Sequence, residues 1–544
     1  MRKLGTILLV LGLLACGVTA AAAEGEIPVS TDQAEMRLTG NRGLHYINGN
    51  GMGHSPPTSF LYANGKGGVT LVQFISAGDG VTVAEYDSDL QFVSFRSVPV
   101  EGLTDWGGFC AGEDYNYVVY AVDKAVIRVD QYDKEWNPVN HLVHTFGNTR
   151  SFISNDMDLA VGGGSLFIVT NHIMSDGAAS GHEANLRLQV DESTLRVTAE
   201  HSGVGDYDGY CSHSFVPETL WAGGILYTLD RCDAFPGAGI YLCAFDGSLN
   251  RGLSMQGIKA MAFRDWGNIG SAAAAGQALI TAYNYADGDD HYTNTDVFLN
   301  RFEPGGAPQT VQVTYTGGAG TPYAAAVDNS FGYVLWNTDI RSDMAPVDTL
   351  FYAPYYVGDS LTVGEVRTAE GNFLSDCDPI SWQGGLLWFT TDGRDVTFHR
   401  LGTDGTVTKT TFHDPVEREA VAPTVWDVGY TAGTQCSRCG AWLSGHEEIP
   451  RVEALISEAA EDGGSVTARF QCSRPEYTAI FAAYGEGGRL LQAETAEYSV
   501  SGSQAKSFQL PEGWERCKVM LIDSDGCPLC PAWESGSSAP AESE

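Results

Sequence analysis

A recurring pattern of apolar positions organises the first three quarters of the chain. A glycine or another turn residue precedes a mostly apolar and aromatic run, and the pattern returns every 48 to 60 residues. Such runs, rich in β-branched and aromatic residues and bounded by turn residues, predict strands. The runs begin after Gly68, Asn116, Gly164, Gly224, Gly276, Gly332 and Gly385.

Each run has similar neighbours along the chain. Two strands around a tight turn follow it, as at 186–197 and 396–408, and a small-residue strand such as 323–328 precedes it. Four strands joined by hairpins in 40 to 50 residues are typical of a β-propeller blade. We therefore predict an all-β chain with a seven-bladed β-propeller over residues 30–412. Two β-sandwiches are the alternative, but they would not explain the regular recurrence.

The pattern changes after residue 412. Residues 413–450 contain the pair Cys436-Ser-Arg-Cys439, which predicts a small Cys-containing module. Over 451–533 the sequence predicts a stretch with helical spacing at 452–458, followed by five strands, and this suits an Ig/fibronectin-like β-sandwich. Cys472 and Cys517 are candidates for a disulfide there. The Ser/Ala/Glu-rich tail at 534–544 is expected to be disordered.

The N-terminus has the pattern of a secretory signal peptide over residues 1–23. Arg2 and Lys3 precede an apolar run at 4–18, and small residues lead to cleavage before Glu24. The alternative is a lipoprotein box ending at Cys16. Both place the protein at the cell surface or in the extracellular space. No later run approaches the ~20 apolar residues that span a bilayer, so we expect no transmembrane helix in the mature chain.

Composition narrows the class of partner. The chain has 31 Lys and Arg against 68 Asp and Glu, a formal net charge of −37. This charge excludes a reader of nucleic-acid phosphates and disfavours binding to anionic lipid. With 43% hydrophobic and 18% charged residues, the chain is expected to fold, and we expect a monomer.

Three segments carry a resemblance to a known class of proteins. Residues 420–450, with APTVW and CSRCG, resemble a Cys-rich repeat of secreted and surface proteins of gut-type Firmicutes. Residues 477–494 and 511–533 resemble the terminal β-sandwich of those proteins, and 155–172 with 211–215 resemble an accompanying propeller region. The resemblance implies an exported bacterial surface protein and no particular reaction.

The same resemblance implies a zinc site. In the related repeat, a preceding His and three Cys would hold Zn²⁺ tetrahedrally. Here His413, Cys436 and Cys439 match, whereas Val425 stands at the position of the first Cys. The set is therefore one ligand short.

Polar residues gather on one predicted face of the propeller. In this fold, the segments leading into the first strands and the loops between second and third strands emerge on the same face. Loops on a rigid scaffold carry many ligand sites, although an isolated Asp often only caps a turn. The predicted ligand-binding residues are His54, Trp106, Asp156, Asp158, His172, His182, His213, Asp230, Asp233, His291, Asp376 and Asp378.

Several chemistries suit such a face. Converging carboxylates could bind Ca²⁺. A pair, Asp156 with Asp376 or Asp158 with Asp378, could act as acid and base on a glycosidic bond. The aromatic residues of this face that could stack on sugar rings are Trp106, Tyr283, Tyr285 and Tyr292. The sequence has no Gly-x-Ser-x-Gly or His-Glu-x-x-His motif.

Three interpretations of function follow. The first is a surface protein whose propeller face binds an extracellular glycan or protein, with no catalysis assumed. The alternative is a polysaccharide hydrolase or lyase that uses the carboxylates and His213 at the channel. The third is a passive spacer.

Overall fold

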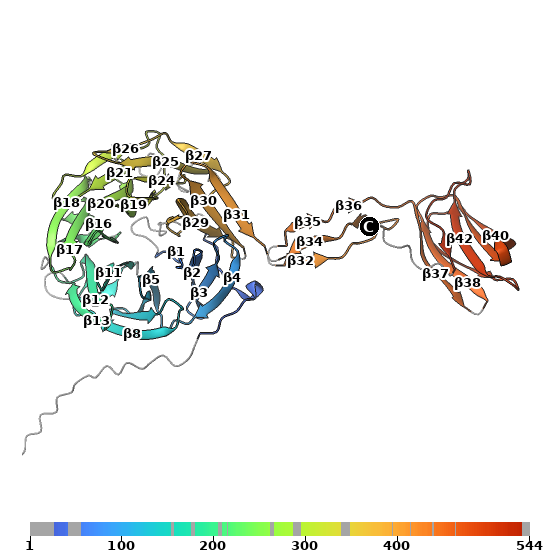
Figure 1. Ribbon diagram of the computed structural model, residues 1–544, viewed down its shortest axis with the longest axis horizontal. Helices are drawn as coiled ribbons and strands as arrows, with labels where there is room; N and C mark the ends of the chain where they lie inside the picture. Colours follow the sequence, from blue (N-terminus) through green and yellow to red (C-terminus); the bar gives the residue numbers. More distant parts are fainter. Residues whose placement is uncertain are drawn as a thin grey trace, which may run out of the picture. The chain divides into compact units, whose positions relative to one another are not determined.

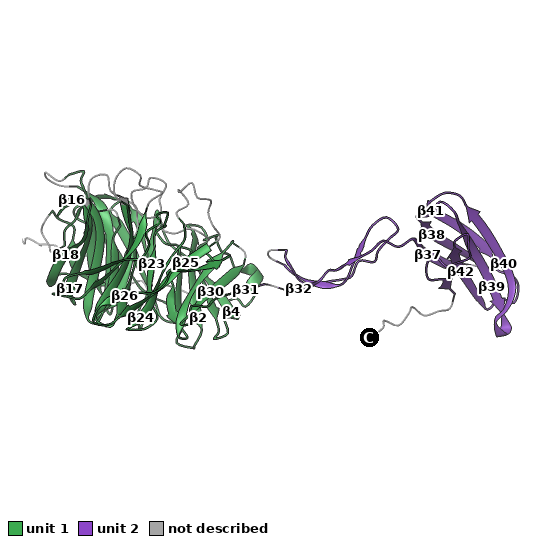
Figure 2. Cartoon of the chain, turned by 90° about the horizontal axis from the view of Figure 1, so that it is seen from above, with its two compact units in different colours: residues 1–412 green, residues 413–544 purple. Residues whose placement is uncertain are grey.

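The chain forms two compact units, residues 1–412 and 413–544 (Figure 2). Besides strands, the described residues contain two short 3-10 turns, η1 (Gln33–Glu35) and η3 (Glu486–Gly488). Among them, no helix is long and apolar enough to cross a membrane. The computed structural model describes residues 27–41, 56–153, 157–175, 180–204, 209–214, 216–261, 266–286, 295–338, 349–393, 395–413, 415–437, 440–462 and 464–535. The predicted signal peptide and Cys16 lie outside these ranges.

The strands of unit 1 follow one another in antiparallel groups. The first two groups are β1 (Ser59–Ala63), β2 (Val69–Ser76), β3 (Gly80–Tyr86) and β4 (Phe92–Val98), then β5 (Asp105–Ala111), β6 (Asn116–Asp123), β7 (Val126–Tyr132) and β8 (Pro138–Thr145). The next two are β10 (Asp158–Gly162), β11 (Ser165–Met174), β12 (Glu183–Asp191) and β13 (Arg196–His201), then β15 (Glu218–Ala222), β16 (Ile225–Phe235), β17 (Gly239–Asp246) and β18 (Gly252–Ala260). The short strand β14 (Ser212–Ser214) joins β12 to β16, and β9 (Thr149–Phe152) pairs with β11.

The remaining groups of unit 1 continue this order. They are β19 (Trp266–Ala275), β20 (Ala278–Ala286), β21 (Asp296–Phe302) and β22 (Gln309–Gln312); β23 (Tyr323–Ala326), β24 (Phe331–Trp336), β25 (Thr349–Val357), β26 (Leu361–Val363) and β27 (Arg367–Glu370); and β28 (Ile380–Trp382), β29 (Gly385–Thr391), β30 (Val396–Gly402) and β31 (Val407–Phe412). The apolar runs of the repeat are confirmed as the second strand of each group.

The second strands are continuous apolar runs because both of their faces are buried. Consecutive side chains of a strand point to opposite faces of its sheet. Val118 and Val119 of β6 accordingly belong to different core clusters, as do Phe167 and Ile168 of β11. A sheet packed on both faces has a neighbouring sheet on each side.

These shared clusters link the groups in a closed circle. Each cluster contains buried residues of two successive groups, and the last group shares one with the first. Figure 1 shows the sheets of unit 1 around a common centre, so this unit is a β-propeller. The residue pairs that share clusters are Val72 with Val118, Val119 with Ile168, Phe167 with Phe245, Leu229 with Leu279, Ile280 with Val334, Leu335 with Trp388, and Phe389 with Leu71.

Asn41 links the first and last groups. It is fully buried, and its backbone N–H donates to the Thr391 carbonyl at 3.1 Å. Its side chain accepts from the Thr391 N–H at 2.7 Å and donates to Ser59 Oγ at 2.9 Å. One buried amide therefore connects β29 with β1, where the circle closes.

Small residues at the centre allow the first strands to approach one another. A Cβ atom built on Gly270 of β19 would overlap with the carbonyl oxygen of Pro322, just before β23. A Cβ atom on Gly108 of β5 would overlap with the carbonyl oxygen of Met157, just before β10. Glycine is thus required where these backbones meet.

Unit 2 begins with short strands and continues with two larger sheets. The short strands are β32 (Pro415–Arg418), β33 (Gly429–Tyr430), β34 (Gly433–Cys436), β35 (Trp442–Gly445) and β36 (Glu448–Ile449). One larger sheet contains β37 (Ala454–Asp462), β38 (Ser465–Cys472) and β41 (Gly502–Gln509); the other contains β39 (Tyr477–Gly485), β40 (Arg489–Tyr498), β42 (Arg516–Ile522) and β43 (Trp533–Glu534). Phe470 of one sheet and Phe481 of the other belong to one core cluster.

Two expectations for unit 2 are wrong. The helical spacing at 452–458 belongs to β37, because an irregularity between Ile456 and Glu458 shifts the alternation, so that Ala454, Ile456 and Ala459 all reach the core. Cys472 and Cys517 are free thiols and have different surroundings. The charges of Glu453 and Arg474 act on the pKa of the Cys472 thiol, whereas the charge of Glu461, at the far end of β37, acts on the pKa of the Cys517 thiol.

The last strand also extends into the predicted tail. Glu534 pairs with Lys518, and the Ser535 N–H donates to the Cys517 carbonyl at 2.8 Å. Ordered structure therefore continues to residue 535, and 536–544 lie outside the described residues.

Candidate functional site

The first strands of the propeller converge on a cavity of about 220 Å³. Its wall is apolar on the strand side and acidic where the strands begin. The lining residues are Pro57, Ser59, Phe60, Leu61, Phe109, Asp158, Leu159, Glu218, Thr219, Leu220, Ala272, Asp376, Asp378 and Ile380. The structure thus brings together three predicted site residues, Asp158, Asp376 and Asp378, with Glu218 as a fourth carboxylate. We call these four residues the channel carboxylates.

Asp158 is the first residue of β10 and is partly buried. One carboxylate oxygen accepts from the Leu159 N–H at 2.9 Å, and the other accepts from the Thr219 N–H. Burial raises the pKa of Asp158 to about 7; the Thr219 hydrogen bond opposes this shift, and the charge of Asp378 adds to it. At neutral pH this carboxyl is therefore protonated in a large fraction of molecules.

Asp376 is buried, with 8% of its surface exposed. Its Oδ2 accepts from the backbone N–H of Thr58 at 2.7 Å and from Thr58 Oγ1 at 2.6 Å. Its Oδ1 is buried and has no hydrogen-bond partner among the described residues. Burial raises the pKa of Asp376, although the Thr58 hydrogen bonds oppose it. A buried oxygen of this kind is satisfied by a water molecule, a ligand or a proton.

Glu218 is the residue that the sequence interpretation missed. It begins β15 as Asp158 begins β10, and its carboxyl interacts with that of Asp158. The repeat itself could have identified Glu218, because Asp158 and Glu218 each lie six residues before the glycine that precedes the next apolar run, Gly164 or Gly224. Equivalent positions in adjacent blades face the same axis.

The described residues that line the cavity include no lysine, arginine or histidine. Such a site accepts hydrogen bonds from a polyhydroxylated ligand, and it can also hold a proton on one carboxyl beside an ionised neighbour.

A second polar group of predicted site residues lies where β14 joins β12 and β16. The rings of His182 and His213 are stacked with centroids 5.9 Å apart, and His213 Nε2 lies 3.7 Å from Glu183 Oε2. Ser214 Oγ donates to the Asp230 carboxylate at 2.9 Å. Burial raises the pKa of Asp230 to about 7. None of these residues lines the channel cavity.

His172 is a core residue of this region. It is fully buried, with Nδ1 2.7 Å from Thr149 Oγ1, and burial lowers its pKa to about 4. The imidazole is therefore neutral at pH 7. It is a packed residue rather than part of the channel mouth.

The predicted aromatic contacts are core packing. Trp106 is 5% exposed, stacks on Phe74 with centroids 4.5 Å apart, and donates through Nε1 to the Pro57 carbonyl at 2.8 Å. Tyr283 and Tyr285 are also buried. His54, Asp156, His291 and Tyr292 lie outside the described residues, as does the side chain of Asp233.

A second cavity of about 390 Å³ has a different character. It lies beside β24 and β25 and is lined mainly by apolar and aromatic residues, including Tyr315, Trp336 and Phe351. Its lining residues include no carboxylate, histidine or cysteine. Of these two cavities, the one at the channel is therefore the one whose described lining carries carboxyl groups.

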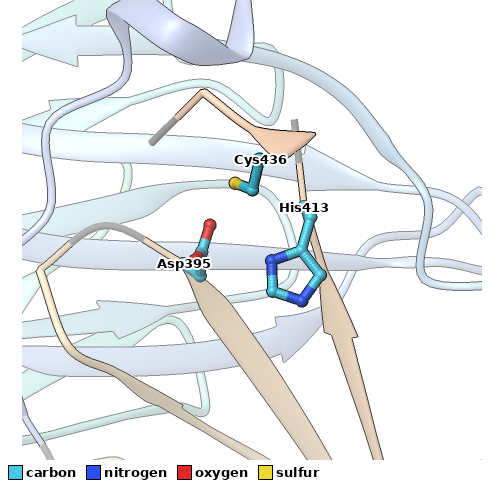
Figure 3. A group of neighbouring side chains, drawn as sticks. All are labelled: Asp395, His413 and Cys436. Carbon is cyan, nitrogen blue, oxygen red and sulfur yellow. The ribbon is translucent and has the colours of Figure 1, made fainter. Parts of the chain in front are cut away.

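His413 and Cys436, two of the predicted zinc ligands, lie close together in unit 2 (Figure 3). Their ligand atoms lie within 4.8 Å of one another. Within the described residues, the channel carboxylates do not form a group of three or more side chains that could hold a metal ion. Cys439, the third predicted ligand, lies outside the described residues.

The chain matches no protein-family model, and no curated protein matches its sequence. Among solved structures, it is similar to the WD40 domain of Neurospora crassa Pan2, with 8% identity, a TM-score of 0.32, and coverage of 65% of this chain and 88% of the other. It is also similar to a thermostable family-43 glycoside hydrolase, with 13% identity, a TM-score of 0.30, and coverage of 51% and 97%.

A third similar structure is an exo-beta-1,3-galactanase from Phanerochaete chrysosporium with beta-1,3-galactotriose. Here the identity is 9%, the TM-score is 0.29, and coverage is 90% of this chain and 96% of the other. Values this low carry no argument about function, which therefore rests on the geometry of the chain itself.

Proposed function

We propose that the protein is exported and that its propeller binds an extracellular glycan at the channel carboxylates. The observation that carries this proposal is the buried Oδ1 of Asp376, which has no hydrogen-bond partner among the described residues and belongs to a residue lining the cavity. A sugar hydroxyl that donates to this oxygen would satisfy it. The N-terminal signal pattern supports export, and the acidic composition supports a partner other than nucleic acid.

The size of the cavity favours a glycan over a protein partner. About 220 Å³ is below the usual range for a drug-sized ligand, so the cavity admits one small polar group rather than a folded surface. The end of a glycan chain meets this requirement, and its hydroxyls match the carboxylate acceptors. A protein partner would bind through a single inserted side chain.

A second candidate function is hydrolysis or lysis of a polysaccharide. The raised pKa of Asp158, about 7, and the nearby charge of Asp378 favour it. A proton-donating carboxyl beside an ionised carboxylate is the pair that glycoside hydrolysis requires. In this reaction Asp158 would protonate the leaving oxygen, and Asp378 would act as base or nucleophile.

A screen of residues 24–544 against glycans tests both candidates when it follows retention together with release of reducing ends. Retention without release, lost in Asp376→Asn, supports binding; release lost in Asp158→Asn and in Asp378→Asn supports the enzyme. The exposed turn residue Asp404 supplies the matched control, Asp404→Asn, which should behave as the unmodified chain. Absence of both signals would contradict both functions and direct the search to protein partners.

We further infer the finer architecture and organisation of the chain. Seven successive strand groups and seven shared clusters support seven blades over residues 30–412. The common core of two sheets supports a β-sandwich over 451–533, preceded by a distinct module at 413–450. A monomeric protein at the cell surface, held there by these C-terminal modules, fits this organisation.

A further inference from the structure

We propose that Thr58 is a positioning residue of the channel, which holds Asp376 so that its Oδ1 is left to accept a hydrogen bond from the ligand. This proposal rests on the proposed glycan binding at the channel carboxylates. Asp376 Oδ2 accepts from the backbone N–H of Thr58 at 2.7 Å and from Thr58 Oγ1 at 2.6 Å. Two donors on one oxygen restrict rotation of the carboxyl group, and the other oxygen, Oδ1, has no hydrogen-bond partner among the described residues.

Thr58 is itself held in place where the circle of strand groups closes. It stands directly before β1, in the first group, whereas Asp376 stands shortly before β28, in the last group. The Thr58 carbonyl accepts from the Phe74 N–H at 2.8 Å. The next residue, Ser59, is fully buried, and its hydroxyl accepts from the Asn41 side chain at 2.9 Å. A fixed backbone at Thr58 therefore gives Asp376 a fixed pair of donors.

The equivalent contact at Asp158 lacks the hydroxyl. Asp158 accepts from the backbone N–H of Thr219 in the following strand group, just as Asp376 accepts from a threonine across the closure. Thr219 Oγ1, however, donates to a backbone carbonyl at 3.0 Å. The other oxygen of Asp158 accepts from the Leu159 N–H at 2.9 Å. Both oxygens of Asp158 are thus engaged by the backbone, whereas the two donors of Thr58 share one oxygen of Asp376.

The Thr58 contact also acts on the charge of Asp376. Burial raises the pKa of Asp376, and the hydroxyl and backbone N–H of Thr58 are the strongest influences that lower it, followed by Ser59. The titratable groups near Asp376 are Asp158, Glu218 and Asp378 in the cavity lining and the buried thiol of Cys377. Loss of the Thr58 hydroxyl should therefore raise the pKa of Asp376 further. Since an ionised carboxylate accepts the stronger hydrogen bond, glycan binding should then be lost at a higher pH as the pH falls.

Thr58→Val tests the proposal in the chain of residues 24–544, because it removes the hydroxyl and keeps the backbone N–H. For a glycan that the unmodified chain retains, calorimetric titration should show an affinity about tenfold weaker, as expected for one hydrogen bond to a charged group. On acidification, Thr58→Val should lose binding at a higher pH than the unmodified chain. Thr58→Ser keeps the hydroxyl and should restore both the affinity and the pH profile.

Thr406 supplies the matched control. Its backbone N–H and its hydroxyl both donate to the exposed carboxylate of Asp404, each at 2.9 Å. Thr406→Val therefore removes the same kind of contact away from the channel, and it should bind glycan as the unmodified chain does.

A double variant separates positioning from a general loss of structure. Thr58→Val combined with Asp376→Asn should bind no more weakly than Asp376→Asn alone, because Thr58 acts through the Asp376 carboxylate. A further tenfold loss in the double variant, or an unchanged affinity in Thr58→Val, would overturn the positioning role of Thr58.

A measurement without ligand distinguishes failure of this inference from failure of glycan binding. Carbon-13 NMR of the aspartate side chains, with the Asp376 signal identified by its loss in Asp376→Asn, should give a higher pKa for Asp376 in Thr58→Val than in the unmodified chain. An unchanged pKa would overturn the inference, whether or not a glycan is retained. A raised pKa in a chain that retains no glycan would contradict the proposed function, and with it the ligand role of Asp376, while the hold of Thr58 on Asp376 would stand.

Discussion

Replacing Asp158 with asparagine should make the propeller more stable at high pH than at low pH, relative to the unmodified chain. Burial raises the pKa of Asp158 from its ordinary value of 3.8 to about 7. Below pH 3.8 the carboxyl is protonated in both the folded and the unfolded chain. As the pH rises towards 7, the unfolded chain ionises first, so the folded state loses stability progressively.

The structure sets the size of this effect. A shift of about three pKa units corresponds to about 4 kcal/mol over the whole titration, and between pH 5 and pH 8 about 2.6 kcal/mol of it is expressed. Because Asp158 is only partly buried, solvent screening reduces this to about 2 kcal/mol. Asparagine also loses one of the hydrogen bonds from Leu159 and Thr219, at a cost of about 1 kcal/mol at every pH.

Chemical unfolding at pH 5 and pH 8 measures the difference. Part of the effect is already expressed at pH 5, where it offsets the lost hydrogen bond, so Asp158→Asn should be about as stable as the unmodified chain at pH 5 and about 2 kcal/mol more stable at pH 8. In the control Asp404→Asn, the relative stability should not rise with pH, because hydrogen bonds from Thr406 lower the pKa of Asp404. The raised pKa would be refuted if the free energy of unfolding of Asp158→Asn differed from that of the unmodified chain by the same amount at pH 5 and pH 8. A carboxyl with an ordinary pKa at this position would give a difference that does not change between these pH values.

Two other changes test the interior. Burial lowers the pKa of His172 from 6.5 to about 4, so its contribution is present above pH 6.5 and is lost as the pH falls towards 4. Between pH 7 and pH 4.5, the free energy of unfolding should therefore fall by about 2 kcal/mol less in His172→Asn than in the unmodified chain. An equal fall in both chains, measured by urea unfolding, would argue against a buried neutral imidazole. Gly270→Ala should lower the free energy of unfolding by about 3 kcal/mol, because the new Cβ overlaps with the Pro322 carbonyl. Gly358→Ala, with open space around it, should change stability by less than about 0.5 kcal/mol, and equal denaturation midpoints for the two variants would contradict the close approach of the inner strands.

The sequence predicted the strands of unit 1 well because each sheet is buried on both faces. Continuous apolar runs then recur once per group, as at 69–76 and 385–391, and turn residues mark their starts. The pattern failed in β37, where an irregularity in the ladder makes a strand resemble a helix turn. Periodicity assumes regular pairing, and it cannot locate an irregularity.

The candidate site was predictable only in part. Asp158, Asp376 and Asp378 were found because acidic residues precede first strands, but Glu218 needed an alignment of positions within the repeat. Trp106 shows the opposite error, since its place at the start of β5 does not reveal that the ring stacks on Phe74.

The most direct test of glycan binding at the channel is the affinity of Asp376→Asn for a glycan that the unmodified chain, residues 24–544, retains. Calorimetric titration should give a dissociation constant weakened by about 10- to 100-fold, since a hydrogen bond to a buried carboxylate contributes about 1.5–3 kcal/mol. Asp404→Asn should bind as the unmodified chain does. Equal affinities for Asp376→Asn and the unmodified chain would contradict the assignment of the ligand to the channel carboxylates.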